Sequence, residues 1–374
     1  MVNLCVMVDL TEEEKARYDR QIRVWGAEAQ TRIQNAKILV VGLNGLHPEV
    51  VKNVVLAGVS VVLLDQRTVD ESDLAYNYFL KNDDVGKNVA EAACPKVQEL
   101  NSFASVSVEK RSLSSLLESD ADFLLQFTEI LVSGGLCCGM EDAIRVDELV
   151  RKAPNGIPFF WSSVGGEEGV FVSDFGEHYH YMKKAPATVK ATATDLTVGT
   201  SSSSSSRKRK AEDENDDNNK SGEEEEIAKK IPVKVTSPSF SQIINKKWSE
   251  VETKKMKKSP SLAKCVVMAK LMDMSRSGTV SSEAVADLVT AEIKKNEVPE
   301  KFLSEDSDIN TLLLQLPRFP SVFTCSILGS YLAQEVIKGI GRTEPPNFNT
   351  SVYAGQGAGV VVYPINDEMK SPVD

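Results

Sequence analysis

Two glycines and an aspartate stand at the ends of two apolar runs. Gly42 and Gly45 follow the apolar residues 38–41, and Asp65 ends a second run at 59–64. A glycine turn between a buried strand and a helix can bring bare backbone N–H groups against a phosphate. An acidic residue at the end of the next strand can hold a ribose hydroxyl. The chemistry that this spacing indicates is nucleotide binding.

The glycine turn is degraded. Asn44 and His47 occupy positions where a Gly-x-Gly-x-x-Gly pattern has glycine, and Pro48 has no N–H to give. Because each missing glycine blocks the approach of the backbone to a phosphate, the turn formed by Gly42, Asn44, Gly45 and His47 is interpreted as degenerate. The strand, turn and helix together are a strong indication of the fold and a weak indication of nucleotide binding. Asp65 is accordingly a weak candidate for a ribose ligand.

A strand, turn, helix and strand are predicted to hold these residues. The apolar runs at 38–41 and 59–64 are typical of strands buried on both faces. Pro48 suits the first helical position, and Gly58 is expected to end the helix. Apolar residues at helical spacing form the helix face that packs on the sheet: Val50, Val51, Val54 and Val55.

The rest of the chain predicts an α/β fold. Strand and helix patterns alternate to about residue 165, which favours a mostly parallel sheet covered by helices on both faces. A capping box at Thr11 and Glu14 predicts a helix that continues to about Arg23, and a second helix is expected at 27–35. Residues 170–173 and 178–181 suggest a hairpin.

Composition limits the function classes. The chain has 374 residues and a net charge of -11, so general affinity for nucleic acid or for a membrane surface is not expected. The six cysteines include no Cys-x-x-Cys pair, and the three histidines have no spacing typical of a metal site. We predict no metal site and interpret the cysteines as packed thiols.

Composition also divides the chain. We expect a first part of an α/β unit at 11–182, a disordered low-complexity insertion at 183–230, a second part at 231–363 and a flexible tail at 364–374. The insertion contains the basic run Arg207, Lys208, Arg209 and Lys210, which is a candidate nuclear import signal because such signals must be exposed. The predicted location is the nucleus, and also the cytoplasm.

The chain resembles the ubiquitin-like modifier activating enzymes, which share their Rossmann-like adenylation fold with the bacterial ThiF and MoeB proteins. Residues 18–26, together with the turn and helix at 37–58, carry the resemblance; the first stretch is Tyr-Asp-Arg-Gln-Ile-Arg-Val-Trp-Gly. The similarity is greatest to the regulatory subunits of the branch that activates SUMO. It implies a heterodimer with a catalytic subunit that holds ATP and Mg²⁺ and adenylates the C-terminal glycine of the modifier.

Several family contacts are missing from this chain. In catalytic subunits a Ser-Asn-Leu-Asn-Arg-Gln-Phe pattern follows the acidic strand end. In this chain the second Asn of that pattern falls on Ala75, and its Arg falls on Tyr76. A family lysine falls on Val89, and residues 134–138 lack the family's metal-binding aspartate. The resemblance therefore implies an inactive half-site with no cofactor or metal of its own and no thioester cysteine.

The resemblance still implies a role in trans, in the ATP site of the partner subunit. The first arginine of the Arg-Gln-Ile-Arg motif is Arg20, and the resemblance implies that it reaches the ATP site of the partner. A guanidinium group suits this role because it stays charged and binds phosphate oxygens in a fork. Arg23 is a weaker candidate.

Three other functions compete with this one. The chain could be the regulatory subunit of an enzyme that activates another modifier, a nicotinamide-dependent oxidoreductase, or a self-sufficient homodimeric adenylating enzyme. The missing glycines at Asn44 and His47 count against the oxidoreductase. The lost arginine, lysine and aspartate positions count against an adenylating enzyme that works alone.

Overall fold

A computed structural model describes most of the predicted α/β unit. The described residues are 9–43, 45–135, 138–154, 156–184, 230–245, 247, isolated positions between 283 and 297, 320–347, 349–354 and 360–363. Asn44, Cys137 and the basic run at 207–210 lie outside these residues, as do most of the predicted insertion and the C-terminal tail.

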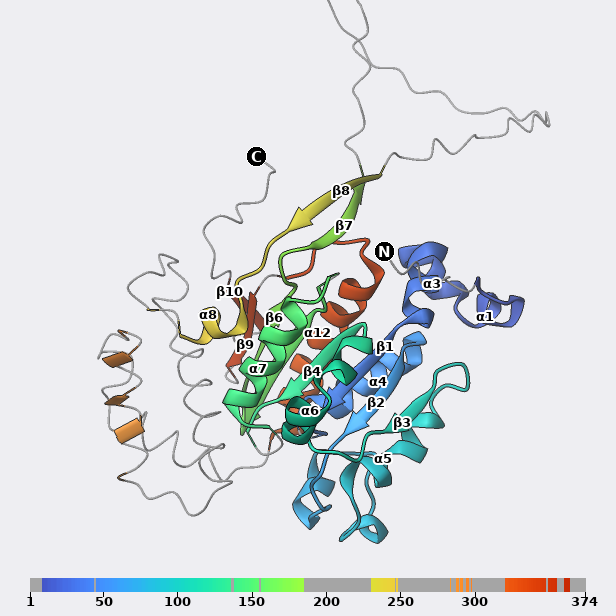
Figure 1. Cartoon of the computed structure of the whole chain (residues 1–374). Helices are drawn as coiled ribbons and strands as arrows, with labels where there is room; N and C mark the ends of the chain where they lie inside the picture. The colour runs from blue at the N-terminus through green and yellow to red at the C-terminus, as the bar shows by residue number, and fades with distance from the viewer. Residues whose placement is uncertain are drawn as a thin grey trace, which may run out of the picture.

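Strands and helices alternate from β1 to β5 (Figure 1). Within the described residues, the α-helices and strands are α1 (Glu12–Arg17), α2 (Asp19–Trp25), α3 (Ala27–Asn35), β1 (Lys37–Val41), α4 (His47–Ala57), β2 (Ser60–Leu64), α5 (Val89–Gln98), β3 (Val106–Val108), α6 (Leu113–Ser119), β4 (Glu129–Ser133), α7 (Met140–Arg151), β5 (Phe159–Gly165), β6 (Glu168–Asp174), β7 (Tyr179–Lys184), β8 (Lys230–Val235), α8 (Phe240–Ile244), α12 (Val322–Gly341), β9 (Asn349–Ala354) and β10 (Val360–Tyr363).

The main sheet has eight strands in the order β10-β9-β6-β5-β4-β1-β2-β3. The five strands from β5 to β3 pair in parallel, while β6, β9 and β10 extend the sheet with antiparallel pairs. Strand β1 lies between β2 and β4, so the turn that follows β1 sits at the middle of the parallel part. The predicted mostly parallel α/β sheet is confirmed.

Helices cover both faces of this sheet, as the continuous apolar strands predict. Within β1, Leu39 and Val41 belong to the core beneath α6, α7 and α8, whereas Ile38 and Val40 belong to the core beneath α4, α5 and α12. All four side chains are fully buried. Each strand residue thus supports one of the two helical layers.

Two predictions of local structure are wrong. The helix expected from Thr11 to Arg23 is two helices, because the chain turns at Tyr18 between α1 and α2. The predicted capping box of Thr11 and Glu14 is present. The expected hairpin does not form, since β6 is paired on one edge with β5 and on the other with β9. Strand β7 pairs with β8 in a separate two-stranded sheet.

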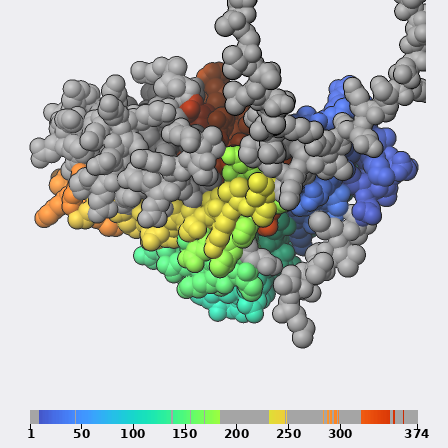
Figure 2. Space-filling view, turned by 90° about the horizontal axis from the view of Figure 1, so that it is seen from above, coloured from blue at the N-terminus to red at the C-terminus, as the bar shows by residue number. Residues whose placement is uncertain are grey.

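Helices α1 and α3 lie on the side of the molecule opposite α8 (Figures 1 and 2). Helix α3 leads directly into the amino end of β1, so these helices lie at the amino edge of the parallel strands. Among the described residues, no helix has the length and apolar character needed to cross a membrane.

Candidate functional site

The turn after β1 directs its first two backbone donors into the protein. The Gly42 N–H donates to the carbonyl of Leu64 at 2.7 Å. The Leu43 N–H donates to Oδ2 of Asp65 at 2.8 Å. Gly42 has a φ of 81°, a conformation that favours glycine. The first two N–H groups of the turn therefore already have acceptors within the chain.

His47 closes this turn from the other side. It is the first residue of α4, is fully buried, and its Nδ1 lies 2.6 Å from the carbonyl oxygen of Gly42. Its Nε2 lies 3.1 Å from the hydroxyl oxygen of Ser162 on β5. A carbonyl only accepts hydrogen bonds, so Nδ1 carries the proton and Nε2 accepts from Ser162. Burial lowers the pKa of His47 to about 4, which keeps the ring neutral near pH 7.

The second glycine of the turn packs against a side chain. Gly45 has a φ of 59°, and a Cβ atom placed on it would lie 2.1 Å from Cγ1 of Val164. Val164 belongs to β5 and is buried. The close approach that Gly45 permits is thus an approach to the protein's own strand. Asn44, the remaining residue of the predicted turn, lies outside the described residues.

Asp65 is engaged by a cation of the same chain. Its carboxylate is buried, accepts from the backbone N–H of Arg67 and forms an ion pair with the Arg67 guanidinium at 3.0 Å. The same guanidinium reaches Asp73 at 3.0 Å. Tyr76, which occupies the position of a family arginine, donates its hydroxyl to Asp73. Burial raises the pKa of Tyr76, so the hydroxyl keeps the proton that it donates.

The position after β4 has little room for an acidic side chain. A Cβ atom on Gly134 would lie 2.5 Å from Nε1 of Trp161, whose indole is fully buried. That indole packs against Phe240 with ring centroids 5.2 Å apart. Within the described ranges, no group of three His, Cys, Asp or Glu residues could hold a metal ion.

Sequence patterns did not identify Arg67, Ser162, Val164 or Trp161 as parts of this region. Arg67 follows Asp65 by two residues, and that short spacing is the one local signal that could have indicated the ion pair. Ser162 lies 115 positions from His47 in the chain, so no local pattern joins them.

The two arginine candidates lie on α2, which buries none of its residues. Arg23 is paired with Asp19 at 2.9 Å. Arg17, on α1, donates to the carbonyl of Leu100 and lies over the ring of Phe103. Arg20 is exposed and makes no hydrogen bond or ion pair within the part of the chain that the structure describes. Arg20 is therefore the better placed of the two candidates to bind an external anion.

The structure does not bring Arg20 together with the glycine turn. The turn and Asp65 follow the carboxyl ends of β1 and β2, whereas α2 lies at the amino edge of the same strands. A strand of five residues separates the two edges by about 17 Å. These are two separate regions of the molecule.

A mostly parallel sheet, covered by helices on both faces and with a glycine turn after its first strand, defines a Rossmann-like α/β protein. The model of the ThiF family matches residues 18–359, and the chain belongs to that family.

The relatives agree in their names. SUMO-activating enzyme subunit 1 of Danio rerio is 29% identical over 359 residues, which cover 95% of this chain and 96% of that protein. The Homo sapiens protein of the same name is 28% identical, with 94% of this chain and 95% of that protein covered. The protein of that name from Xenopus tropicalis is 37% identical over 177 residues, which cover 47% of this chain and 49% of that protein.

Solved structures support the fold alone. A crystal structure of PaaA is similar with a TM-score of 0.55 at 14% identity and covers 96% of this chain and 84% of that chain. A structure of Escherichia coli MccB gives a TM-score of 0.50 at 13% identity, with 94% and 72% covered.

The buried histidine predicts a pH dependence. The unfolded state binds a proton near pH 6.5 and the folded state only near pH 4, so the stabilisation by neutral His47 is fully present above pH 6.5 and is lost as pH falls toward 4. A His47→Asn variant lacks this term. In urea unfolding, the difference between wild type and variant should shrink by about 2 kcal/mol from pH 7 to pH 5.

The matched control is His180→Asn, at an exposed position of β7 that donates nothing to the turn. Its difference from wild type should stay small at both pH values. An unchanged difference for His47→Asn would contradict a neutral, buried imidazole.

Proposed function

We propose that this chain is the regulatory subunit of a SUMO-activating enzyme and that it supports adenylation of SUMO in the active site of a catalytic partner. Membership of the ThiF family and the names of its relatives support the class of enzyme. The observation that carries the proposal is Arg20, an exposed arginine with no partner among the described residues, on a helix far from this chain's own glycine turn.

In this proposal ATP and Mg²⁺ bind to the partner, and this chain holds neither alone. Three features support that assignment: His47 closes the turn, Arg67 engages Asp65, and Trp161 crowds Gly134. A triphosphate bound here would have to displace hydrogen bonds that buried groups already make, and each such loss is costly.

No cysteine that the structure describes fits a thioester nucleophile. Cys138 and Cys325 are buried, and Cys94 is half-buried. Burial raises the pKa of Cys94 and raises that of Cys325 to about 12. A thiol that holds its proton is a poor nucleophile. Because these three described cysteines are buried or half-buried, we assign the thioester step to the catalytic partner in this proposal.

Arg20 would act on the phosphates of the partner-bound ATP. When the carboxylate of the modifier's C-terminal glycine attacks the α-phosphorus, pyrophosphate leaves and negative charge must be stabilised on the phosphate oxygens. A guanidinium group held against those oxygens supplies two charge-assisted hydrogen bonds. Arg23 is a lesser candidate because Asp19 already pairs with it.

The other candidates have less support. A subunit for another modifier would share the same geometry, but the relatives named above are SUMO-activating subunits. An oxidoreductase or a self-sufficient adenylating enzyme would use the turn that His47 and Val164 close.

The first prediction from this proposal concerns ATP–pyrophosphate exchange in the presence of SUMO. The chain alone should give no exchange, and a mixture with the catalytic subunit of a SUMO-activating enzyme should give full exchange. Exchange by the chain alone would show that the turn at Gly42 works, and the proposal would fail. No exchange in the mixture would assign the chain to another modifier or activity.

The second prediction concerns Arg20. In the heterodimer, Arg20→Ala should lower kcat for exchange about 100-fold because one group that stabilises developing charge is removed. Arg23→Ala should have little effect, since an exposed ion pair contributes little. Gel filtration of each heterodimer controls for assembly. Full exchange by an assembled Arg20→Ala heterodimer would refute the role in trans.

We also propose that the chain accumulates in the nucleus through Arg207, Lys208, Arg209 and Lys210, a run of four basic residues. Replacing all four by alanine in a fluorescent fusion should shift the protein toward the cytoplasm. Replacing Ser201 to Ser204 by alanine is the control. Unchanged nuclear accumulation of the basic-run variant would contradict this role.

A further inference from the structure

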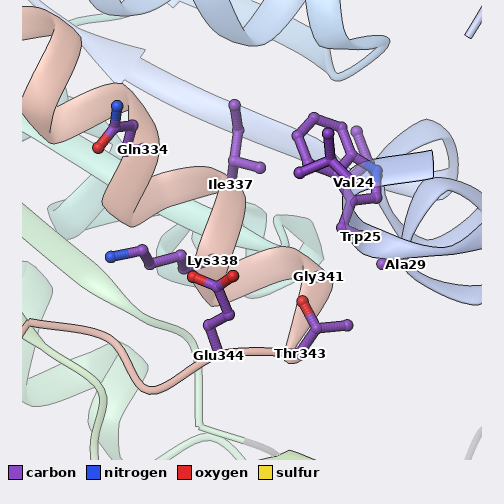
Figure 3. Close-up of a pocket in the computed structure, with 10 residues that line it drawn as sticks. Val24, Trp25, Ala29, Gln334, Ile337, Lys338, Gly341, Thr343 and Glu344 are labelled. Carbon is purple, nitrogen blue, oxygen red and sulfur yellow. The ribbon is translucent and has the colours of Figure 1, made fainter. Parts of the chain in front are cut away.

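Helix α2 carries Arg20 and packs against the core through Trp25. It has seven residues, none of them buried. A pocket of about 200 Å³ lies between its carboxyl end and the last turns of α12 (Figure 3). Val24 and Trp25 line one side of this pocket, and Ile337 and Gly341 line the other. A helix this short is not stable by itself, so the contacts that anchor its two ends fix its direction.

The amino end of α2 is fixed through Tyr18. This residue joins α1 to α2, and its side chain is 1% exposed. Its hydroxyl oxygen accepts from Nδ2 of Asn101 at 2.8 Å. The same Nδ2 donates to the carbonyl of Val55 at 2.7 Å. Asn101 is buried, so these bonds are shielded from water.

The carboxyl end is fixed through Trp25 in the same manner. The indole N–H donates to Oε1 of Gln30 at 2.9 Å. The Nε2 group of Gln30 donates to the carbonyl of Ala57, also at 2.9 Å. Gln30 is fully buried. A buried side-chain amide again links an aromatic residue of the α2 region to a backbone carbonyl.

Both links end on the last turn of α4. Val55 and Ala57 are two residues apart, and Ala57 directly precedes Gly58, where the helix ends. The last carbonyls of a helix lack the usual i+4 donor and can accept from side chains. Gly58 has a φ of 107°, and a Cβ atom there would lie 3.1 Å from the Tyr18 hydroxyl oxygen. Glycine at this position therefore allows Tyr18 to approach the end of α4.

We propose that Asn101 and Gln30 are positioning residues for adenylation in trans. Acting through Tyr18 and Trp25, they hold both ends of α2 on the carboxyl end of α4 and thereby direct Arg20 at the triphosphate in the partner. This inference rests on the proposed function. In this inference the carboxyl end of α4 anchors α2, a role that does not require a phosphate bound at the amino end of α4.

The test removes one polar group from each link. Tyr18→Phe deletes the hydroxyl, and Trp25→Phe deletes the indole N–H while keeping an aromatic ring. In the heterodimer with the catalytic subunit, the double variant should lower kcat for ATP–pyrophosphate exchange about tenfold, because a small misplacement of a catalytic group is costly. KM for SUMO and heterodimer assembly should not change.

The same substitutions made in Arg20→Ala protein distinguish a loss of positioning from general damage to the enzyme. In Arg20→Ala protein, adding the two phenylalanine substitutions should cause no further loss of kcat, since there is no guanidinium left to direct. An equal tenfold loss in both backgrounds would overturn the inference and leave the role of Arg20 intact. A harmless Arg20→Ala would overturn the role in trans and the inference with it.

Tyr78→Phe is the matched control. The Tyr78 hydroxyl donates to the carbonyl of Pro48 at 2.7 Å, so this variant also removes a tyrosine hydrogen bond to α4, but at the opposite end of the helix. It should retain kcat. A tenfold loss in this control would show that kcat responds to any hydrogen bond on α4, and the inference would fail.

Hydrogen exchange of the full chain tests the inference without an activity assay. The amides of residues 19–25 should exchange faster in the double variant, while those of α4 keep their protection. Unchanged exchange in α2 would overturn the inference.

Discussion

The neutral side chain of His47 contacts three elements of the fold. Its Nδ1–H binds Gly42 at the end of β1, its Nε2 accepts from Ser162 on β5, and its backbone begins α4. A charged imidazole could not serve as acceptor for the Ser162 hydroxyl, so the arrangement depends on burial that keeps the ring neutral. The turn is consequently set close enough to β5 for Gly45 to pack on Val164.

Fixing the start of α4 also fixes its end, because a helix of eleven residues is a rigid rod. The carbonyls of Val55 and Ala57 then stand at a defined place for Asn101 and Gln30. The chain of constraints runs from the closed turn through α4 to α2. His47 at the start of α4 and the Tyr18 and Trp25 links at its end thus belong to one connected set of contacts.

The parts of the fold that were predictable are those whose signal is local. Strands β1 and β2 and helix α4 follow from apolar runs, Pro48 and Gly58, since burial on both faces requires uninterrupted apolar residues. The partners of His47 and Tyr18 were not predictable, because Ser162 and Asn101 lie 115 and 83 positions away. The predicted hairpin is wrong for the same reason, because β6 pairs with a strand that follows it by more than 170 residues.

Charge distribution separates the two candidate regions more clearly than the glycine pattern does. Arg67 faces the buried carboxylates of Asp65 and Asp73, so the positive charge near the turn is already engaged within the chain. On α2 the reverse holds: Asp19 pairs with Arg23, and Arg20 keeps an exposed charge that no described residue balances. An anion approaching this protein gains little at the turn, where binding would require breaking buried ion pairs, and gains a fork of donors at Arg20 without breaking any. The exposed cation is thus at the amino edge of the sheet, whereas the glycine turn follows the carboxyl end of β1, and the proposed role in trans rests on this separation.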